Sequence, residues 1–330
     1  MVAGKYHIVG LGAALVDVIA NVSEAELTAL GTPKGAMELV DPDTALALLE
    51  KISIHTHAAG GSAANTIAGT ATLGLSSGFV GKVADDDFGQ LFTADLDKMG
   101  ITLSSSPLQD GAPTGRCIVL VTPDAERTMH TMIGAASAVS PADLDINMLR
   151  DTALFFAEGY IFDSPQGSAT FTQACEMVHA GGGRAVLSLS DAFCVDRHRA
   201  RFTQALAGEI DLLMANLNEA CAMFNTDGPE GCVAAMQQAG LDGVITRSEK
   251  GAIAIIDGTV HEIAAAPVAE PVDLTGAGDQ FAAGFLSGLA MGLPVGICGR
   301  RGALAAAEVI SHFGPRPQTN IAALLSDAGV

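Results

Sequence analysis

The chain has 330 residues, of which 49% are hydrophobic and 16% charged. This composition is typical of a globular protein with a large core and argues against extensive disorder. A formal net charge of −20 argues against nucleic acid or an anionic membrane as the main partner. It leaves room for a small phosphate-bearing ligand, because backbone N–H groups, helix N-termini and a divalent cation can hold one without a basic patch.

Six cysteines lie scattered along the chain without CxxC pairs. Their spacing predicts buried thiols in a reducing compartment. The first residues lack the sustained apolar segment of a signal peptide. The sequence also lacks the run of about 18 apolar residues that would predict a membrane span. We therefore expect a cytoplasmic protein.

Short apolar runs rich in β-forming residues alternate with alanine-rich helical stretches. The runs are 7–11, 78–83, 153–159, 185–190, 210–216 and 243–248. This alternation predicts an α/β fold, a mostly parallel sheet covered by helices on both faces. Ligands of such sheets bind beyond the carboxyl ends of the strands. The glycines at 181–183 predict a turn between a helix and a strand.

One region departs from this alternation. Residues 114–133 contain two extended runs around the turn PDAE, which predicts an antiparallel hairpin. With the segment 12–40, where helical periodicity is weak, it predicts a small β-sheet lid. We expect one domain over 1–330, with the lid formed by about 12–40 and 106–133. Such a lid could close over a reacting centre and expel water.

The segment 58–74, AAGGSAANTIAGTATLG, predicts a tightly packed helix that Gly74 ends. Its glycines allow close approach of the backbone to another group. Ser62 is the candidate cap. Asn65 lies in the first turn, where its amide could face a ligand. The alternative is a tight turn and a well-packed helix with no ligand.

The segment 273–285, DLTGAGDQFAAGF, places two glycines and a carboxylate before an apolar helix. Gly276 and Gly278 allow successive N–H groups to form an anion site at the helix N-terminus. Asp279 would be ionised there and able to accept a proton. Phe281, Phe285 and Leu289 would anchor the helix in the core. The alternative is that Asp279 only caps the helix.

N–H donors beside a carboxylate suit phosphoryl transfer, in which the protein positions reactants, stabilises charge and deprotonates a hydroxyl. No P-loop, HExxH or G-x-S-x-G motif is found. The early GLGAAL begins like a dinucleotide fingerprint, but Leu15 replaces its third glycine.

These segments resemble the ribokinase-like (PfkB) family of carbohydrate and purine kinases. Residues 273–289 resemble its C-terminal signature, and GGSAANTIAGTATLG with 81–89 resembles its N-terminal one. The resemblance implies a three-layer α/β/α domain with a lid, and ATP and Mg²⁺ as cofactors. It makes Asp279 the catalytic base. The N–H groups of Gly276, Ala277 and Gly278 would form the anion hole.

The resemblance also assigns residues to the two substrates. Asp17, Gly61 and Asn65 match contacts to the sugar. Asn216 and Glu219 match an N-x-x-E motif near Mg²⁺ and the phosphates, with Glu219 acting through water. Residues beside the nucleotide are Thr246, Ser248 and Gly251, although Ser248 stands where a glycine is frequent. From the residues alone, Asp17 could lie in a solvated turn, and Asn216 and Glu219 could simply cap a helix.

Three further residues carry alternatives. Asp273 and Thr275 match positions that bind a monovalent cation, K⁺, in some members of the family. Arg127 could swing its guanidinium onto the transferring phosphate when the lid closes. A solvated surface arginine is the alternative.

For the acceptor, the stretches 113–137, 187–193 and 303–317 are closer to adenosine kinase than to ribokinase. Tyr160, Phe162 and Phe193 are candidate walls for a nucleobase, although Ile161 falls where an aromatic would be expected and all three could be core. We expect a kinase that phosphorylates the primary 5′ hydroxyl of a nucleoside, adenosine to AMP, in purine salvage. The alternatives are a ribose or fructose kinase and a non-catalytic nucleoside- or sugar-binding protein. The chain would be a monomer or a lid-mediated homodimer.

Overall fold

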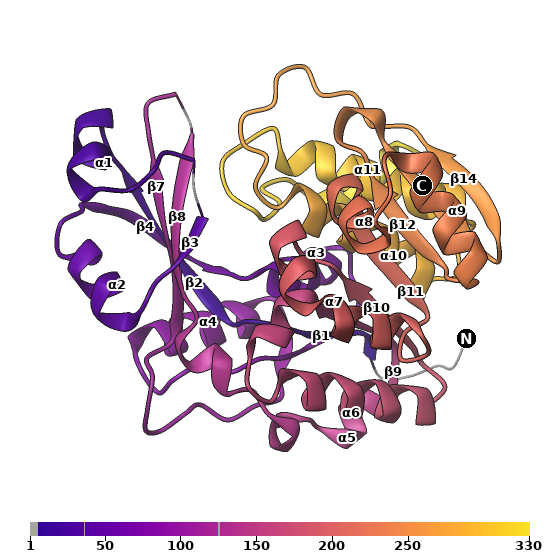
Figure 1. Cartoon of the computed structure of the whole chain (residues 1–330), viewed down its shortest axis with the longest axis horizontal. Helices are drawn as coiled ribbons and strands as arrows, with labels where there is room; N and C mark the ends of the chain where they lie inside the picture. The colour runs from indigo at the N-terminus through magenta and orange to yellow at the C-terminus, as the bar shows by residue number, and fades with distance from the viewer. Residues whose placement is uncertain (1–5, 36, 125) are drawn as a thin grey trace.

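The computed structural model describes residues 6–330 except 36 and 125. Its larger sheet has nine strands in the order β14-β13-β12-β11-β10-β9-β1-β5-β6 (Figure 1). The strands are β1 Tyr6–Leu11, β5 Ser77–Val80, β6 Thr102–Leu103, β9 Thr152–Glu158, β10 Arg184–Ser188, β11 Leu212–Asn216, β12 Gly243–Thr246, β13 Ala252–Ile256 and β14 Thr259–Ile263. All neighbours pair in parallel except β12 with β13 and β13 with β14. The six predicted runs all form strands of this sheet, which confirms the predicted mostly parallel α/β fold.

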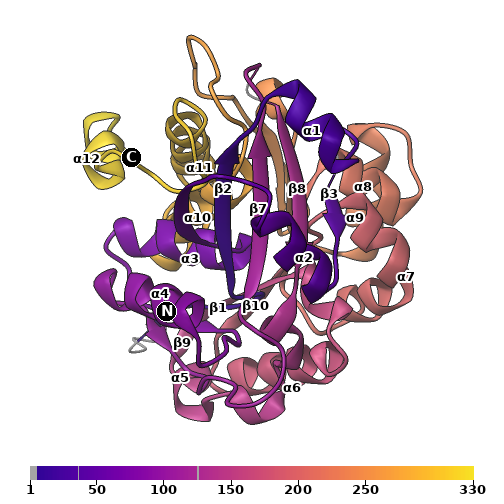
Figure 2. The same cartoon turned by 90° about the vertical axis from the view of Figure 1, so that its left-hand side faces the viewer.

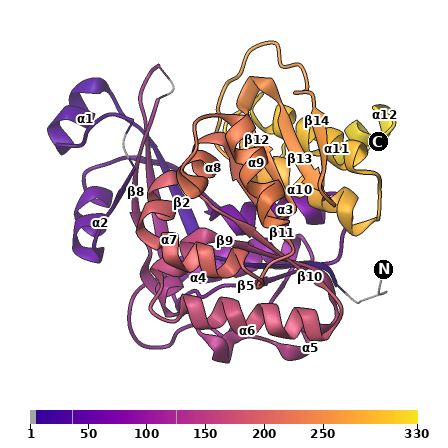
Figure 3. The same cartoon turned by 45° about the vertical axis from the view of Figure 1, so that its right-hand side comes forward.

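Helices cover both faces of this sheet because its strands are apolar on both sides. In β9, Phe155 packs into one core, while Leu154 and Phe156 pack into the other. The first face is covered by α5 Ile146–Arg150, α6 Gly167–Ala180, α7 Ala192–Leu206, α8 Leu217–Phe224 and α9 Pro229–Ala239. The second is covered by α3 Ser62–Thr72, α4 Asp87–Lys98, α10 Ala277–Ala290 and α11 Val295–Val309 (Figure 3). The short α12 Ile321–Asp327 packs on α11.

A second, smaller sheet stands beside the larger one, with strand order β3-β8-β7-β2-β4 (Figure 2). Its strands are β2 Leu15–Asn21, β3 Met37–Leu39, β4 Ile54–Gly60, β7 Gly115–Val121 and β8 Arg127–Met132. Two helices, α1 Glu24–Leu30 and α2 Pro42–Leu49, pack on the outer face of this sheet, away from the rest of the molecule (Figure 1). We call these five strands the lid sheet.

The predicted hairpin is present, since β7 and β8 pair antiparallel, from Arg116 with Met132 to Val121 with Arg127. Ala125, in its PDAE turn, lies outside the described residues. The lid sheet also includes β4, which the expected ranges 12–40 and 106–133 leave out. The segment 12–40 also contains the helix α1, which its weak helical periodicity does not predict. The residues at its two ends indicate this helix instead: Ser23 and Glu26 form a capping box, and Gly31 ends the helix with φ 74°.

Two further sequence expectations are met locally. Gly182 adopts φ 81° in the turn that follows α6. Phe281 and Phe285 stack in the core under α10, where Leu289 packs partly buried against them. Cysteines 175, 194, 232 and 298 are buried, while Cys117 and Cys221 are partly exposed. Within the described residues, the helices are too short or too polar to cross a membrane.

Candidate active site

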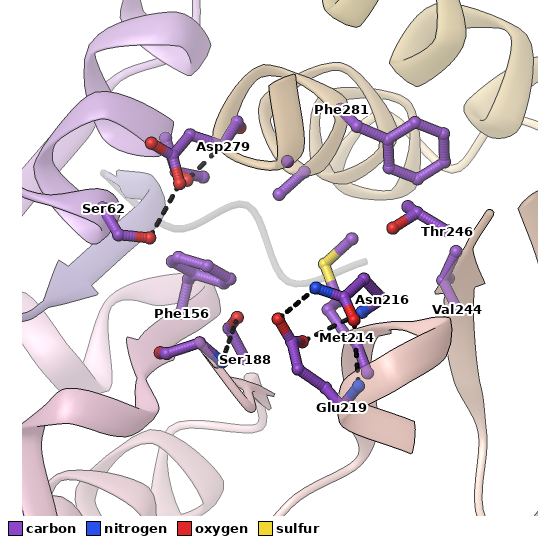
Figure 4. A pocket seen from close by; sticks show the side chains of 15 residues that line it. Ser62, Phe156, Ser188, Met214, Asn216, Glu219, Val244, Thr246, Asp279 and Phe281 are labelled. Atoms are coloured by element: carbon purple, nitrogen blue, oxygen red, sulfur yellow. Dashed lines mark hydrogen bonds between the residues drawn. The ribbon is translucent and has the colours of Figure 1, made fainter. Parts of the chain in front are cut away.

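The candidate site is a cavity at the carboxyl ends of β10, β11 and β12, facing the N-terminus of α10. It measures about 100 Å³. Asp279 and Ser62 lie on one side of it, and Asn216 and Glu219 lie opposite (Figure 4).

Asp279 is held by two side chains from the first turn of α3. Ser62 donates its hydroxyl to Oδ1 at 2.7 Å, and the Asn65 amide donates to Oδ2 at 3.2 Å. Burial raises the pKa of Asp279 to about 6, against the lowering effect of these hydrogen bonds and of Arg316. The carboxylate is thus fixed in direction and poised to take a proton near neutral pH.

Ser62 does not cap α3, contrary to the prediction. Gly61 is the N-cap and has no side chain to do so, and Ser62 is the first helical residue. Gly61 adopts φ 96°, and a Cβ there would lie 2.2 Å from the Ala13 carbonyl oxygen. Because Gly61 occupies the N-cap position with a positive φ, the Ser62 hydroxyl is not used as a cap and can donate to Asp279.

The two glycines of the α10 N-terminus differ in their surroundings. Gly276 has φ 78°, and a Cβ there would lie 2.5 Å from the Pro315 carbonyl oxygen. A Cβ on Gly278 would meet no heavy atom within 4 Å, so this glycine opens space beside Asp279. The Ala277 N–H donates to the Leu274 carbonyl at 3.2 Å. One of the three N–H groups expected in the anion hole is therefore already paired in this arrangement.

Asp17, on β2, approaches from the lid sheet. Its carboxyl atoms lie so close to Gly60 that a Cβ there would be 2.5 Å from them. Burial raises its pKa to about 6, Arg316 and Arg127 lower it, and Asp279 raises it. Asp17 therefore lies near enough to Asp279 for the two charges to interact, although it does not line the cavity. The structure thus brings Asp17, Asn65 and Asp279 together from β2, α3 and α10.

Glu158, at the end of β9, is a buried carboxylate that sequence reasoning missed. Its two oxygens accept the N–H groups of Ala13 and Ala63, each at 2.7 Å. Burial raises its pKa to about 7, and the charge of Asp279 adds to that rise. Glu158 therefore fastens the loop after β1 to the start of α3, which carries both partners of Asp279.

Asn216 and Glu219 form a capping box at the start of α8. Asn216 Oδ1 accepts the Glu219 N–H at 2.9 Å, and Glu219 Oε2 accepts the Asn216 N–H at 2.9 Å. The Asn216 amide also donates to Glu219 Oε1 at 2.5 Å. Burial raises the pKa of Glu219 to about 7. Both residues line the cavity with Thr246, so the helix cap and the predicted site coincide.

Ser248 and Gly251 follow β12 in the turn that leads to β13. Ser248 has φ 52° and Gly251 has φ 78°. The left-handed backbone at 248 gives a physical reason for a glycine at this position, because a side chain is strained there. Neither residue lines the cavity around Asp279.

Arg127, on β8, forms an ion pair with Asp273 in the loop before α10. The Asp273 carboxylate also accepts the N–H groups of Thr275 at 3.0 Å and Gly314 at 2.8 Å. The pair joins the lid sheet to the loop around Gly276. It also places a guanidinium on the carboxylate expected to bind K⁺, so Asp273 and Thr275 do not fit a K⁺ site in this arrangement.

The three aromatic candidates do not line the cavity. Phe162 is buried and contacts Phe171 and Phe202 edge-on, as a core residue does. The Tyr160 hydroxyl bonds the Asp191 carboxylate, and burial together with that bond raises the pKa of Tyr160. Phe193, by contrast, is 74% exposed at the start of α7.

Other residues of the site carry weak sequence signals. Ser188 and Ser190 line the cavity at the end of β10, and Ser190 has φ 71° and accepts the Gly159 N–H at 2.8 Å. Arg316 contacts Asn65 from the C-terminal loop. The family resemblance indicates that loop only through the stretch 303–317.

The family model of pfkB family carbohydrate kinases matches residues 36–321. The chain belongs to this family. A solved structure of a probable sugar kinase from Rhizobium etli is 34% identical, with a TM-score of 0.93 and 99% of each chain covered. Adenosine kinase from Sinorhizobium meliloti is 35% identical, with a TM-score of 0.92 over 98% of this chain and 99% of that one. The fructokinase of Escherichia coli is 26% identical over 70% of this chain and 76% of its own length.

This membership makes the protein a kinase of the PfkB type with the ribokinase-like fold, and it confirms the predicted family and enzyme class. ATP and a small-molecule acceptor are the substrates of such kinases. The alternative of a non-catalytic binding protein is thereby set aside. The relatives differ in their named acceptors, so family membership does not identify the acceptor of this chain.

Proposed function

We propose that the protein transfers the γ-phosphoryl group of ATP to the primary 5′ hydroxyl of a nucleoside, with adenosine as the acceptor and AMP as the product. The observation that carries this choice is the inner face of the lid sheet, the side that carries Asp17, which is largely apolar. A free sugar offers mostly hydroxyl groups, whereas a nucleoside adds a flat, largely apolar base that such a face can cover.

The strand register identifies the residues of this inner face. Arg127 pairs with Asp273 in the loop before α10, so its side of β8 faces that loop. Apolar residues on the same side, by alternation and pairing with Asp17, are Ile19, Val119, Met129, Met37 and Leu39. Cys117 and Thr131 lie on this side next to Asp17. Met37 and Leu39 are 42% and 55% exposed. The opposite side of the sheet is filled by α1 and α2.

The chemistry follows from the cavity. Asp279 accepts the proton of the acceptor hydroxyl while the hydroxyl oxygen attacks the γ-phosphorus of ATP. The bond between that phosphorus and the oxygen that leaves with ADP breaks. Ser62 and Asn65 hold the carboxylate in line. The start of α10, opened by Gly278, stabilises the charge on the phosphoryl group. Asp17 binds the ribose hydroxyls.

Glu219 could bind Mg²⁺ only through water, because both of its carboxylate oxygens accept hydrogen bonds from Asn216 in the α8 cap. A Mg²⁺ ion that arrives with ATP would neutralise phosphate charge there. Among the described residues, no cluster of three or more acidic, histidine or cysteine side chains is arranged to hold a metal.

The test is an ADP-release assay with ATP and Mg²⁺ over adenosine, other nucleosides, ribose and fructose. We expect turnover with adenosine and formation of AMP. Turnover with ribose or fructose and none with adenosine would overturn the proposal. A sugar acceptor is the second candidate, because Tyr160 and Phe162 do not face the cavity and a fructokinase is among the relatives.

Several finer expectations stay predictions. They are closure of the lid sheet over the acceptor, a monomer or a dimer through the lid sheets, a place in purine salvage, and the cytoplasm as compartment. Potassium dependence is not part of the proposal, since Arg127 holds the Asp273 carboxylate.

A further inference from the structure

The loop 314–317, GPRP, is tied to the candidate site by its backbone. The Gly314 N–H donates to Asp273 at 2.8 Å. The side-chain amide nitrogen of Gln280 donates to the backbone carbonyl of Pro315 at 3.0 Å and to the backbone carbonyl of Asn65 at 3.1 Å. Gln280 is 1% exposed, so this junction is a fixed part of the core.

This junction presents Arg316 to the partner of the base. Arg316 Nε donates to Asn65 Oδ1 at 3.1 Å, and its Nη1 forms an ion pair with Asp95 on α4. An arginine side chain can only donate hydrogen bonds, so the Asn65 oxygen must face Arg316. The amide NH₂ of Asn65 is then turned to Asp279, where it donates at 3.2 Å. If the amide flipped, it would present an oxygen to a carboxylate.

Arg316 is also the positive charge that acts on both carboxylates of the site. Asp279 is faced by Asp17 from β2, by Glu158 from β9 and by Arg316 from the C-terminal loop. Arg127 from β8 acts on Asp17. Burial raises the pKa of Asp279, and Arg316 lowers it. Loss of Arg316 should therefore raise the pKa of Asp279 further.

We propose that Arg316 is a positioning residue for phosphoryl transfer, which fixes the Asn65 amide and so keeps the Asp279 carboxylate aimed and ionised. The inference rests on the proposed role of Asp279 as base. It explains why a side chain from the C-terminal loop reaches α3, and it assigns Asn65 a function toward Asp279 in addition to the expected sugar contact.

The first test compares Arg316→Gln with Arg316→Lys in the full-length protein. Arg316→Gln should lower kcat about 10- to 100-fold, since a hydrogen bond to a charged group contributes about 1.5–3 kcal/mol. The acid limb of its pH–kcat/KM profile should move to higher pH, and the KM for ATP should stay unchanged. Arg316→Lys keeps the charge without the planar fork. It should restore the acid limb and leave kcat reduced.

Asp95→Asn and Arg184→Gln serve as controls. Asp95→Asn removes the outer partner of Arg316 and leaves its contact with Asn65 in place. Arg184→Gln removes a half-exposed arginine that lies 3.8 Å from Asp242, away from the cavity. Both should keep the wild-type pH profile. If Arg316 only tied α3 to α4, Asp95→Asn would cost as much as Arg316→Gln and neither would move the acid limb, which would overturn the proposal.

A second measurement does not depend on activity. A ¹³C NMR titration of the side-chain carboxyls, with the Asp279 signal assigned from the Asp279→Asn variant, reports protonation directly. The Asp279 signal should titrate at higher pH in Arg316→Gln than in the wild type, and an unchanged midpoint would refute the inference. If the wild type does not phosphorylate adenosine, only the proposed function is overturned. The titration measures the protonation of Asp279 without any acceptor.

Discussion

The two sides of the candidate site are built in different ways. The phosphate side comes from one local segment, where Gly276, Gly278 and Asp279 are set by the backbone at the start of α10. The acceptor side is assembled from β2, α3, β9 and the C-terminal loop, which are far apart in the sequence. The phosphate side can therefore be recognised in the sequence as one motif. The contacts of the acceptor side form only when distant segments fold together.

Replacing the base should have the largest effect and test the phosphate side directly. We expect Asp279→Asn to lose at least about 10²–10⁴-fold in kcat, the usual share of general-base catalysis. The variant should fold, because an amide can still bond Ser62 and the substitution removes a buried charge. Steady-state kinetics and thermal melts at pH 8 measure both. Near-normal turnover would contradict the assigned role.

The two glycines of α10 offer a matched pair. Gly278→Ala should melt like the wild type, because its Cβ meets no atom within 4 Å, yet it should lose about 10²-fold in kcat by filling the phosphoryl space. Gly276→Ala should lower stability by about 1–3 kcal/mol, because of its positive φ and the contact with Pro315. Equal losses of stability would show that both glycines serve only the backbone.

On the acceptor side, Asp17→Asn should raise KM for the acceptor about 10- to 100-fold, since hydrogen bonds to a charged group contribute about 1.5–3 kcal/mol. KM for ATP should hardly change, because Asp17 lies on the lid sheet. Initial rates with each substrate varied in turn separate the two constants. A rise confined to the KM for ATP would place Asp17 on the wrong substrate.

Both sides share carboxyls whose pKa is raised, which links stability to pH. The pKa is about 6 for Asp17 and Asp279 and about 7 for Glu158 and Glu219. These groups bind protons more tightly when folded, so their stabilisation is full below about pH 4 and is lost as pH rises through 6 to 7.

We expect Tm to fall by several degrees between pH 5 and pH 8, since 1 kcal/mol moves Tm by roughly 2–4 °C in chains of 150–250 residues. Activity should rise over the same interval as Asp279 ionises. Asp279→Asn should reduce the slope of Tm against pH. A Tm that rises through this window would contradict the expected protonation.

The smallest effect is expected at Ser248, whose φ of 52° strains a side chain. Ser248→Gly should raise the free energy of unfolding by up to about 1 kcal/mol. Activity should change little, because residue 248 does not line the cavity. Chemical denaturation measures the change, with Ser248→Ala as the control that keeps the strain.

The sequence predicts features that depend on local pattern. The alternation of strands and helices identifies the larger sheet, and the glycines before Asp279 identify its turn. Contacts between distant residues are not encoded in this way. The pattern around Ser62 predicts a helix cap, but its hydroxyl bonds Asp279, 217 residues later. Tyr160 and Phe162 follow β9 as expected, yet the side chain of Phe162 points into the core, a direction that the sequence does not specify.

The Arg316 contact has a consequence for how the protein is made. The chain is synthesised from its N-terminus, and Asn65 meets Arg316 across 251 positions. A nascent chain that already contains Asp17, Asn216 and even Asp279 still lacks the residue that orients the base. Such a growing chain would therefore reach full catalytic power only after residue 316 has been synthesised.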